Sequence, residues 1–133
     1  MENTILAEIK NEMEYQLANI KVSAIVTLSK LIERKKNNKN NIFLCGVGKS
    51  GNLAKHCSDL LKSIAFPTFY LDVLNSTHGD IGILQKEDLV LLFSNSGNTR
   101  ELVELIPLLK KKKTTIIGVC SVSYTHLTLP TKW

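Results

Sequence analysis

The sequence predicts an α/β fold in three layers, with a parallel, flavodoxin-like sheet between helices. Two observations carry this prediction: short apolar runs alternate with segments of helical periodicity, and polar turns rich in glycine or serine follow two of the runs. Strands are predicted at about 42–45, 68–71, 88–93 and 114–119, and helices at about 49–65 and 98–111. Pro107 lies inside the last helical pattern, where it predicts a kink or a local break.

The first 40 residues predict a long N-terminal helix, over 2–35, followed by a polar linker. Its apolar stripe is made of Leu6, Ile9, Met13, Leu17, Ile20, Ala24, Leu28 and Leu31. Because one helix cannot bury its own stripe, we expect it to pack on the following domain or to join a homo-oligomer. We therefore divide the chain into residues 1–40, an α/β domain at 41–119 and an atypical tail at 120–133.

Composition narrows the class of protein. The chain has 44% hydrophobic and 22% charged residues, as a soluble globular domain does, and no apolar run of the roughly 20 residues that span a membrane. The N-terminus lacks a signal pattern, so we expect a cytoplasmic protein. Cys45, Cys57 and Cys120 predict reduced thiols and no metal set. The net charge is +5, but no aromatic residues are interleaved with the basic residues, so nucleic acid is not expected as a partner.

The turn after the first strand is the first candidate ligand site. In IFLCGVGKSG, residues 42–51, the glycines have G-x-G-x-x-G spacing, and Lys49 and Ser50 lie inside the turn. Backbone N–H groups and the helix dipole at such a turn suit a phosphate. A mononucleotide P-loop is not favoured because Phe43 stands where its first glycine belongs. A dinucleotide site, with Asp72 on a ribose, and a turn without a ligand both stay open.

The turn after the third strand, Ser94 to Thr99, is the second candidate. It holds three hydroxyls, two amides and a glycine at a predicted helix start. Helix capping alone would explain part of it, with Ser96 or Asn98 as the cap and Glu101 completing a capping box with Asn98. The cluster is richer than one cap needs. Two anion-binding turns on one sheet edge favour a single sugar phosphate over a dinucleotide.

Three motifs in this order, GVGKSG, HGDIG and SNSGNTRE, resemble the sugar isomerase (SIS) domain, and more narrowly the arabinose-5-phosphate isomerases of the KpsF/GutQ type. The resemblance covers about residues 41–119. It implies a flavodoxin-like fold and an aldose–ketose isomerase without a cofactor. The implied reaction interconverts D-arabinose 5-phosphate and D-ribulose 5-phosphate.

The resemblance also implies roles for single residues. Lys49 and Glu101 match two of the four catalytic positions of the family, and His78 matches a histidine at the mouth of the active site. Residues implied in binding the phosphate or nearby hydroxyls are Gly48, Ser50, Ser94, Asn95, Ser96 and Thr99. His78 could also contact an inhibitory zinc ion or only hydrogen-bond its own loop, and no metal site is otherwise expected.

The chain departs from the family pattern after Val119. The other two catalytic positions, a glutamate and a histidine, are not found there, and we expect the last part of the domain to be missing. A partial domain of this kind is expected to be weak or inactive alone. The alternative function is a non-catalytic sugar-phosphate-binding module, and a dinucleotide enzyme is the third.

Overall fold

The computed structural model describes residues 2–77 and 79–121. The chain divides between Leu31 and Ile32 into two compact units. The larger unit carries the sheet, both candidate turns and every polar network discussed below. Among the described helices, none combines the length and apolarity needed to cross a lipid bilayer.

Two helices replace the single long helix expected over residues 2–35. They are α1, Glu2–Ala18, and α2, Val22–Asn37. The side-chain amide of Asn19 donates to the carbonyl oxygen of Tyr15 at 2.7 Å, at the end of α1. Asparagine competes in this way with the backbone bonds of a helix, so it favours an end over an interior position. The apolar stripe continues across this break, which is why periodicity alone did not reveal it.

The sheet has four parallel strands in the order β2-β1-β3-β4. They are β1, Ile42–Gly46; β2, Thr68–Tyr70; β3, Leu89–Ser94; and β4, Thr115–Cys120. The predicted parallel α/β sheet is therefore confirmed. Strand β2 lies on one side of β1, and β3 and β4 lie on the other.

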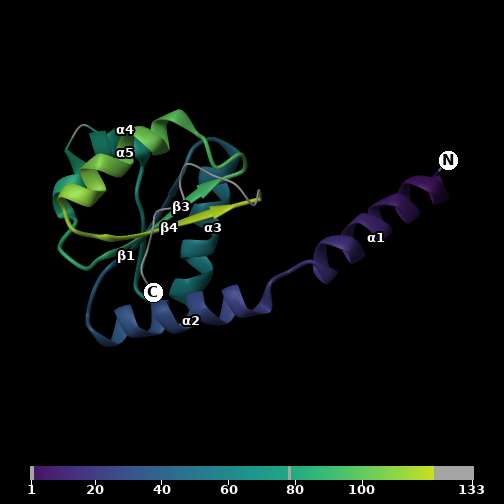
Figure 1. Ribbon diagram of the computed structural model, residues 1–133, viewed down its shortest axis with the longest axis horizontal. Coiled ribbons are helices and arrows are strands. Elements are labelled where there is room, and N and C mark those ends of the chain that lie inside the picture. The colour runs from purple at the N-terminus through teal and green to yellow at the C-terminus, as the bar shows by residue number, and fades with distance from the viewer. Residues whose placement is uncertain (1, 78, 122–133) are drawn as a thin grey trace. The chain divides into compact units, whose positions relative to one another are not determined.

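Helices cover both faces of the sheet, which gives the three predicted layers. The helix α3, Lys49–Ser63, lies on one face, and α5, Arg100–Lys111, lies on the other beside the short α4, Val73–Thr77 (Figure 1). Alternate strand residues point to each face. The core under α5 consists of Phe43, Cys45, Leu71, Val73, Leu84, Val90, Leu92, Leu102, Leu105, Ile106, Leu109 and Ile116.

Two local expectations need correction. Of the kink or local break predicted at Pro107, the break does not occur: helix α5 continues through Pro107, which lies on the exposed side of the helix. The segment after β2, predicted as a loop, contains α4 and the 3₁₀ helix η1, Asp80–Ile83. Asp72 starts α4 by accepting the backbone N–H of Asn75 at 3.1 Å.

The edge of the sheet at the amino ends of its strands is closed by buried polar bonds. The carboxylate of Asp88, 2% exposed, accepts the N–H of Asn41 at 2.9 Å and that of Gln85 at 2.8 Å. The ammonium of Lys35, 4% exposed, donates to the carbonyl oxygen of Glu87 at 2.6 Å and to Thr115 Oγ1 at 2.8 Å. The charged groups of Asp88 and Lys35 are hydrogen-bonded to partners within the fold, so the role of these two residues is structural.

Candidate functional site

Both predicted turns lie at the opposite edge of the sheet, at the carboxyl ends of β1 and β3. These strands are neighbours, with Gly46 paired to Phe93 at their last shared register position. The strand order reverses between β1 and β3, because β2 lies beyond one and β4 beyond the other. Parallel α/β sheets bind ligands at this kind of switch point.

Close backbone contact explains the glycines of the first turn. A Cβ on Gly51 would lie 2.7 Å from the carbonyl oxygen of Gly46, and one on Gly46 would lie 2.8 Å from the nitrogen of Gly51. Gly48 has φ 60°, in the left-handed region that favours glycine. The phenol of Tyr70, at the end of β2, donates to the Gly46 oxygen at 3.4 Å. Contacts within the protein therefore fix the shape of this turn without a ligand.

The amino end of α3 is available to a ligand at this turn. Gly48 is its N-cap, and no side chain of the described residues caps it. The first N–H groups of a helix have no partner within the helix, and the dipole makes this end positive. Lys49 is exposed and Ser50 is half-buried in the first turn. Cation, hydroxyl and backbone donors therefore gather where an anion is favoured.

Hydrogen bonds within the second turn bring its hydroxyl groups together. The hydroxyl of Ser94, 3% exposed, accepts the N–H of Gly97 at 3.0 Å and lies 2.7 Å from Thr99 Oγ1. Ser96 Oγ accepts the N–H of Asn98 at 3.1 Å. These bonds fix the turn between β3 and α5.

The helix capping considered as an alternative explanation of this turn does not form. The N-cap of α5 is Thr99, not Ser96 or Asn98, and no side chain of the described residues caps this helix. A capping box of Asn98 with Glu101 is therefore not formed. The reason is local: Ser96 serves the N–H of Asn98 inside the turn, and Thr99 Oγ1 faces Ser94. The amino end of α5 consequently resembles that of α3 in offering donors to a ligand.

One hollow joins the two turns. Its volume is about 270 Å³, close to the lower end of the range for small-molecule sites. Ser50 comes from the first turn, and Ser94 and Asn95 come from the second. The other residues that line it are Leu53, Phe93, Val119, Cys120 and Ser121. The sequence-predicted residues that do not line it are Gly48, Lys49, Ser96, Thr99 and Glu101, and His78 lies outside the described residues.

Sequence reasoning missed the contribution of β4 to this hollow. Val119 and Cys120 end that strand, and the hydroxyl of Ser121 lies 2.6 Å from both the carbonyl oxygen and Oδ1 of Asn95. A signal was present, because β4 was predicted and ligands gather at the carboxyl ends of all such strands. The sequence pattern instead assigns the residues from Cys120 onward to the atypical tail.

Two titratable groups beside the first turn are shifted. Burial raises the pKa of the Cys45 thiol to about 12, so this thiol stays protonated and inert at neutral pH. Burial, then the charge of Asp72 and then Cys45, raise the pKa of Tyr70, which keeps its phenol a donor to Gly46. Among the described residues, no group of three or more His, Cys, Asp or Glu side chains is placed to hold a metal ion.

The fold and these turns define a doubly wound α/β domain with a ligand hollow at the switch point of its sheet. The SIS domain model matches residues 37–128, and the chain belongs to the SIS domain family. The family expected from the three motifs is thus confirmed.

Curated relatives share part of this chain. Arabinose 5-phosphate isomerase KdsD from Pseudomonas aeruginosa is 40% identical over 81 residues, which are 61% of this chain and 25% of that protein. Arabinose 5-phosphate isomerase KpsF from Escherichia coli is 37% identical over 83 residues, which are 62% of this chain and 26% of that protein. The chain spans about a quarter of the length of these relatives.

Solved structures match over almost the whole chain. A candidate phosphosugar isomerase involved in capsule formation from Bacteroides fragilis has a TM-score of 0.84 and 31% identity, covering 96% of this chain and 68% of that one. An Escherichia coli CFT073 protein in complex with a sugar phosphate has a TM-score of 0.77 and 29% identity, covering 96% and 70%.

Proposed function

We propose that this chain provides the phosphate-binding part of an aldose–ketose isomerase that interconverts D-arabinose 5-phosphate and D-ribulose 5-phosphate. One observation carries the proposal: hydroxyl groups from two separate turns, Ser50 after β1 and Ser94 after β3, line one hollow at the switch point. The names of the KdsD and KpsF relatives support the choice of substrate. No metal or organic cofactor takes part in the proposed reaction.

The phosphate group is held, in this proposal, between the amino ends of α3 and α5. Ser50, Ser94 and Asn95 supply side-chain bonds, and the backbone of Gly48 supplies the shape of the turn. Ser96 and Thr99 complete the second turn and hold nearby hydroxyls of the sugar. A phosphate fixed in this way sets which sugar carbons reach the reacting groups.

Lys49 and Glu101 are the groups that we assign to the chemistry. Isomerisation moves a proton from one carbon to its neighbour through an enediol, so it needs a base and a group that stabilises negative charge on oxygen. Glu101, in the first turn of α5, is assigned the proton transfer. Lys49, the first residue of α3, is assigned the oxyanion. His78, which lies outside the described residues, is assigned the transfer of protons or the orientation of the substrate.

Calorimetric titration of the chain with arabinose 5-phosphate tests the proposed site. We expect Ser94→Ala or Ser50→Ala to weaken binding about tenfold or more, because each removes a hydrogen bond to a charged group. Ser63→Ala is the matched control on α3, since its hydroxyl donates to Leu60 O at the far end of the helix. Equal affinity in all four proteins would contradict the site.

A non-catalytic sugar-phosphate-binding module is the second candidate. It is favoured by one observation: Lys49 and Glu101 do not line the hollow, whereas the serines do. Coupled assay of ribulose 5-phosphate formation by the full-length protein, which would supply the catalytic positions absent from this chain, decides between the two. If the protein is an isomerase, Lys49→Ala and Glu101→Gln abolish turnover while binding persists. If it is a module, neither wild type nor variants turn over the sugar, and all of them bind it.

We also propose that the N-terminal helix joins copies of this chain. Leu6, Ile9, Met13 and Leu17 recur on α1 at spacings of three and four residues, and nothing else within residues 2–31 covers them. Sedimentation equilibrium tests this. Ile9→Glu with Met13→Glu should convert an oligomer to a monomer, whereas Glu12→Gln, off the stripe, should not.

A further inference from the structure

A second hollow lies at the other edge of the sheet, beside the amino ends of β1 and β2. Its volume is about 600 Å³, within the range of small-molecule sites. All of its residues belong to the larger unit. They come from the end of α2 with its linker and from the end of α3 with its turn: Lys36, Lys39, Asn40, Asn41, Lys62, Ala65, Phe66 and Pro67.

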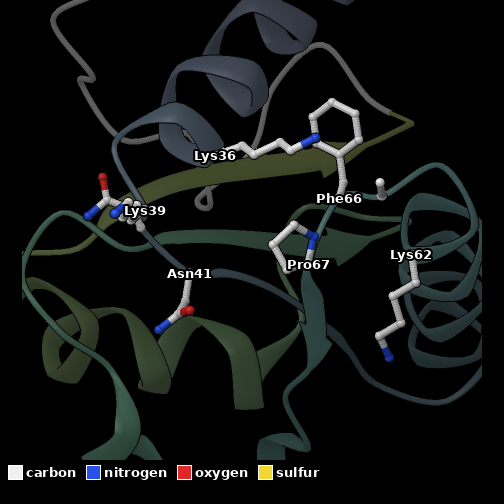
Figure 2. Close-up of a pocket in the computed structure, with 8 residues that line it drawn as sticks. Lys36, Lys39, Asn41, Lys62, Phe66 and Pro67 are labelled. Atoms are coloured by element: carbon white, nitrogen blue, oxygen red, sulfur yellow. The ribbon is translucent and has the colours of Figure 1, made fainter.

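The walls of this hollow combine positive charge with an apolar surface. Lys36 and Lys39 approach from one side, Lys62 lies on the other, and the rings of Phe66 and Pro67 lie between them (Figure 2). The Lys36 ammonium lies 4.5 Å from the centre of the Phe66 ring, a cation–π contact. None of the described residues that line the hollow is acidic.

Lysine is common at helix carboxyl ends, where it balances the negative end of the helix dipole, so the charge balance must be considered. Both helix ends here turn back on themselves: the N–H of Asn40 donates to Lys35 O at 2.9 Å, and that of Phe66 to Leu61 O at 2.9 Å. Each dipole contributes about half a negative charge.

The remaining balance at the hollow is positive. Asp59 lies 3.8 Å from the Lys62 ammonium and offsets part of its charge. Three full cations outweigh this carboxylate together with the two helix ends. The excess favours an anionic ligand, and a simple anion would make no use of the ring surface.

We propose that this hollow binds a phosphorylated small molecule of the nucleotide class. Lys36, Lys39 and Lys62 take the phosphate groups, Asn40 and Asn41 add amide donors, and the base or ribose packs on Phe66 and Pro67. The inference is independent of the proposed sugar-phosphate site, which lies at the opposite edge of the sheet. It gives the domain two separate sites for phosphorylated ligands.

Calorimetry of the 133-residue chain with ATP, inorganic triphosphate and adenosine, without Mg²⁺ and at fixed ionic strength, tests the proposal. ATP is expected to bind about tenfold more tightly than triphosphate, because the ring surface contributes as well as the lysines. Lys36→Gln with Lys62→Gln should weaken ATP binding about tenfold or more. The matched control, Lys55→Gln with Lys110→Gln, removes the same charge from exposed positions outside the hollow and should leave ATP affinity unchanged.

Three outcomes would overturn the proposal. These are the absence of ATP binding, equal losses in the test and control variants, and triphosphate binding as tightly as ATP. Saturating arabinose 5-phosphate provides a further arm: ATP affinity should not change in its presence. Displacement of ATP would place it at the carboxyl edge instead. Failure of arabinose 5-phosphate to bind at all would count against the proposed function only.

Discussion

The two edges of the sheet contain similar polar residues but use them differently. At the amino edge, Asp88 and Lys35 are buried and bonded to backbone groups and a hydroxyl. At the carboxyl edge, the helices α3 and α5 begin without side-chain caps, and Ser50 and Asn95 line a hollow. Asp88 and Lys35 have their partners within the fold, whereas the uncapped amino ends of α3 and α5 keep backbone donors for a group outside it.

The largest expected effect on stability comes from a substitution at the amino edge of the sheet. Asp88→Ala leaves the N–H groups of Asn41 and Gln85 buried without their carboxylate, so we expect a loss of about 3–5 kcal/mol in the free energy of unfolding. Urea unfolding followed by circular dichroism measures it. Asp80→Ala is the control at an exposed carboxylate, with an expected change of about 0.5 kcal/mol or less. A similar loss in both variants would contradict the structural role of Asp88 at the amino edge.

The pH dependence of stability extends the comparison of the two edges to the residue before the first turn. Cys45 lies one residue before Gly46 but is buried away from water. Its pKa in the folded chain is about 12 against an ordinary value of 9.0. Above pH 9 the unfolded chain therefore holds fewer protons than the folded one, and stability falls as pH rises, by about 1.4 kcal/mol per pH unit from this thiol. Below pH 9 the thiol contributes no slope.

Urea unfolding between about pH 8 and pH 10.5 checks this. Cys45→Ala should lower stability at every pH by leaving a cavity, but it should flatten the alkaline slope. An unchanged slope in Cys45→Ala would show that other groups cause the alkaline loss.

A smaller effect, and one that raises stability, is expected at the end of α5, next to the amino edge of the sheet. Lys113 has φ 59°, and its N–H donates to Lys110 O at 2.9 Å, so it occupies the left-handed position that glycine usually fills after a helix. Lys113→Gly should raise the free energy of unfolding by about 1 kcal/mol, because it relieves this conformation.

Lys112→Gly is the matched control, since Lys112 has φ −75° and carries the same charge. It should give no gain, and it is expected to lower stability by a few tenths of a kcal/mol because glycine loses more freedom on folding. Thermal unfolding of the two variants side by side measures the difference. A gain from both changes would point to relief of charge repulsion in the lysine run instead.

The smallest effect on stability is expected at the carboxyl edge. Ser96 is exposed, and its one described bond is from the N–H of Asn98, so Ser96→Ala should change the free energy of unfolding by about 0.5 kcal/mol or less. Its effect on arabinose 5-phosphate affinity should be severalfold, measured by the same titration as above. A large stability loss without a loss of affinity would assign Ser96 to the fold.

The sequence was sufficient for the features that depend on strong, repeated signals. Four apolar runs located the strands, and the glycine spacing located the turn between Gly46 and Gly51. The alternation of strands and helices predicted a parallel sheet, and hence the meeting of Ser50 and Ser94 at one edge. Each of these follows from burial or from sterics that hold in any α/β domain.

The features that were missed depend on competition between weak local bonds. Asn19 ends α1 although the apolar stripe continues, and Pro107 fails to break α5 because it lies on the exposed side. Thr99 became the N-cap because Ser96 bonds within its own turn. In each case two outcomes differ by a bond or less, and tertiary packing decides between them.

The pairing of Gly46 with Phe93 has a consequence for how the molecule matures. These residues are distant along the chain, so the hollow between the two turns cannot exist in a nascent segment that contains only the first strand and helix. It is complete only after β3 has paired with β1 and β4 has paired with β3, and non-local pairings of this kind form slowly.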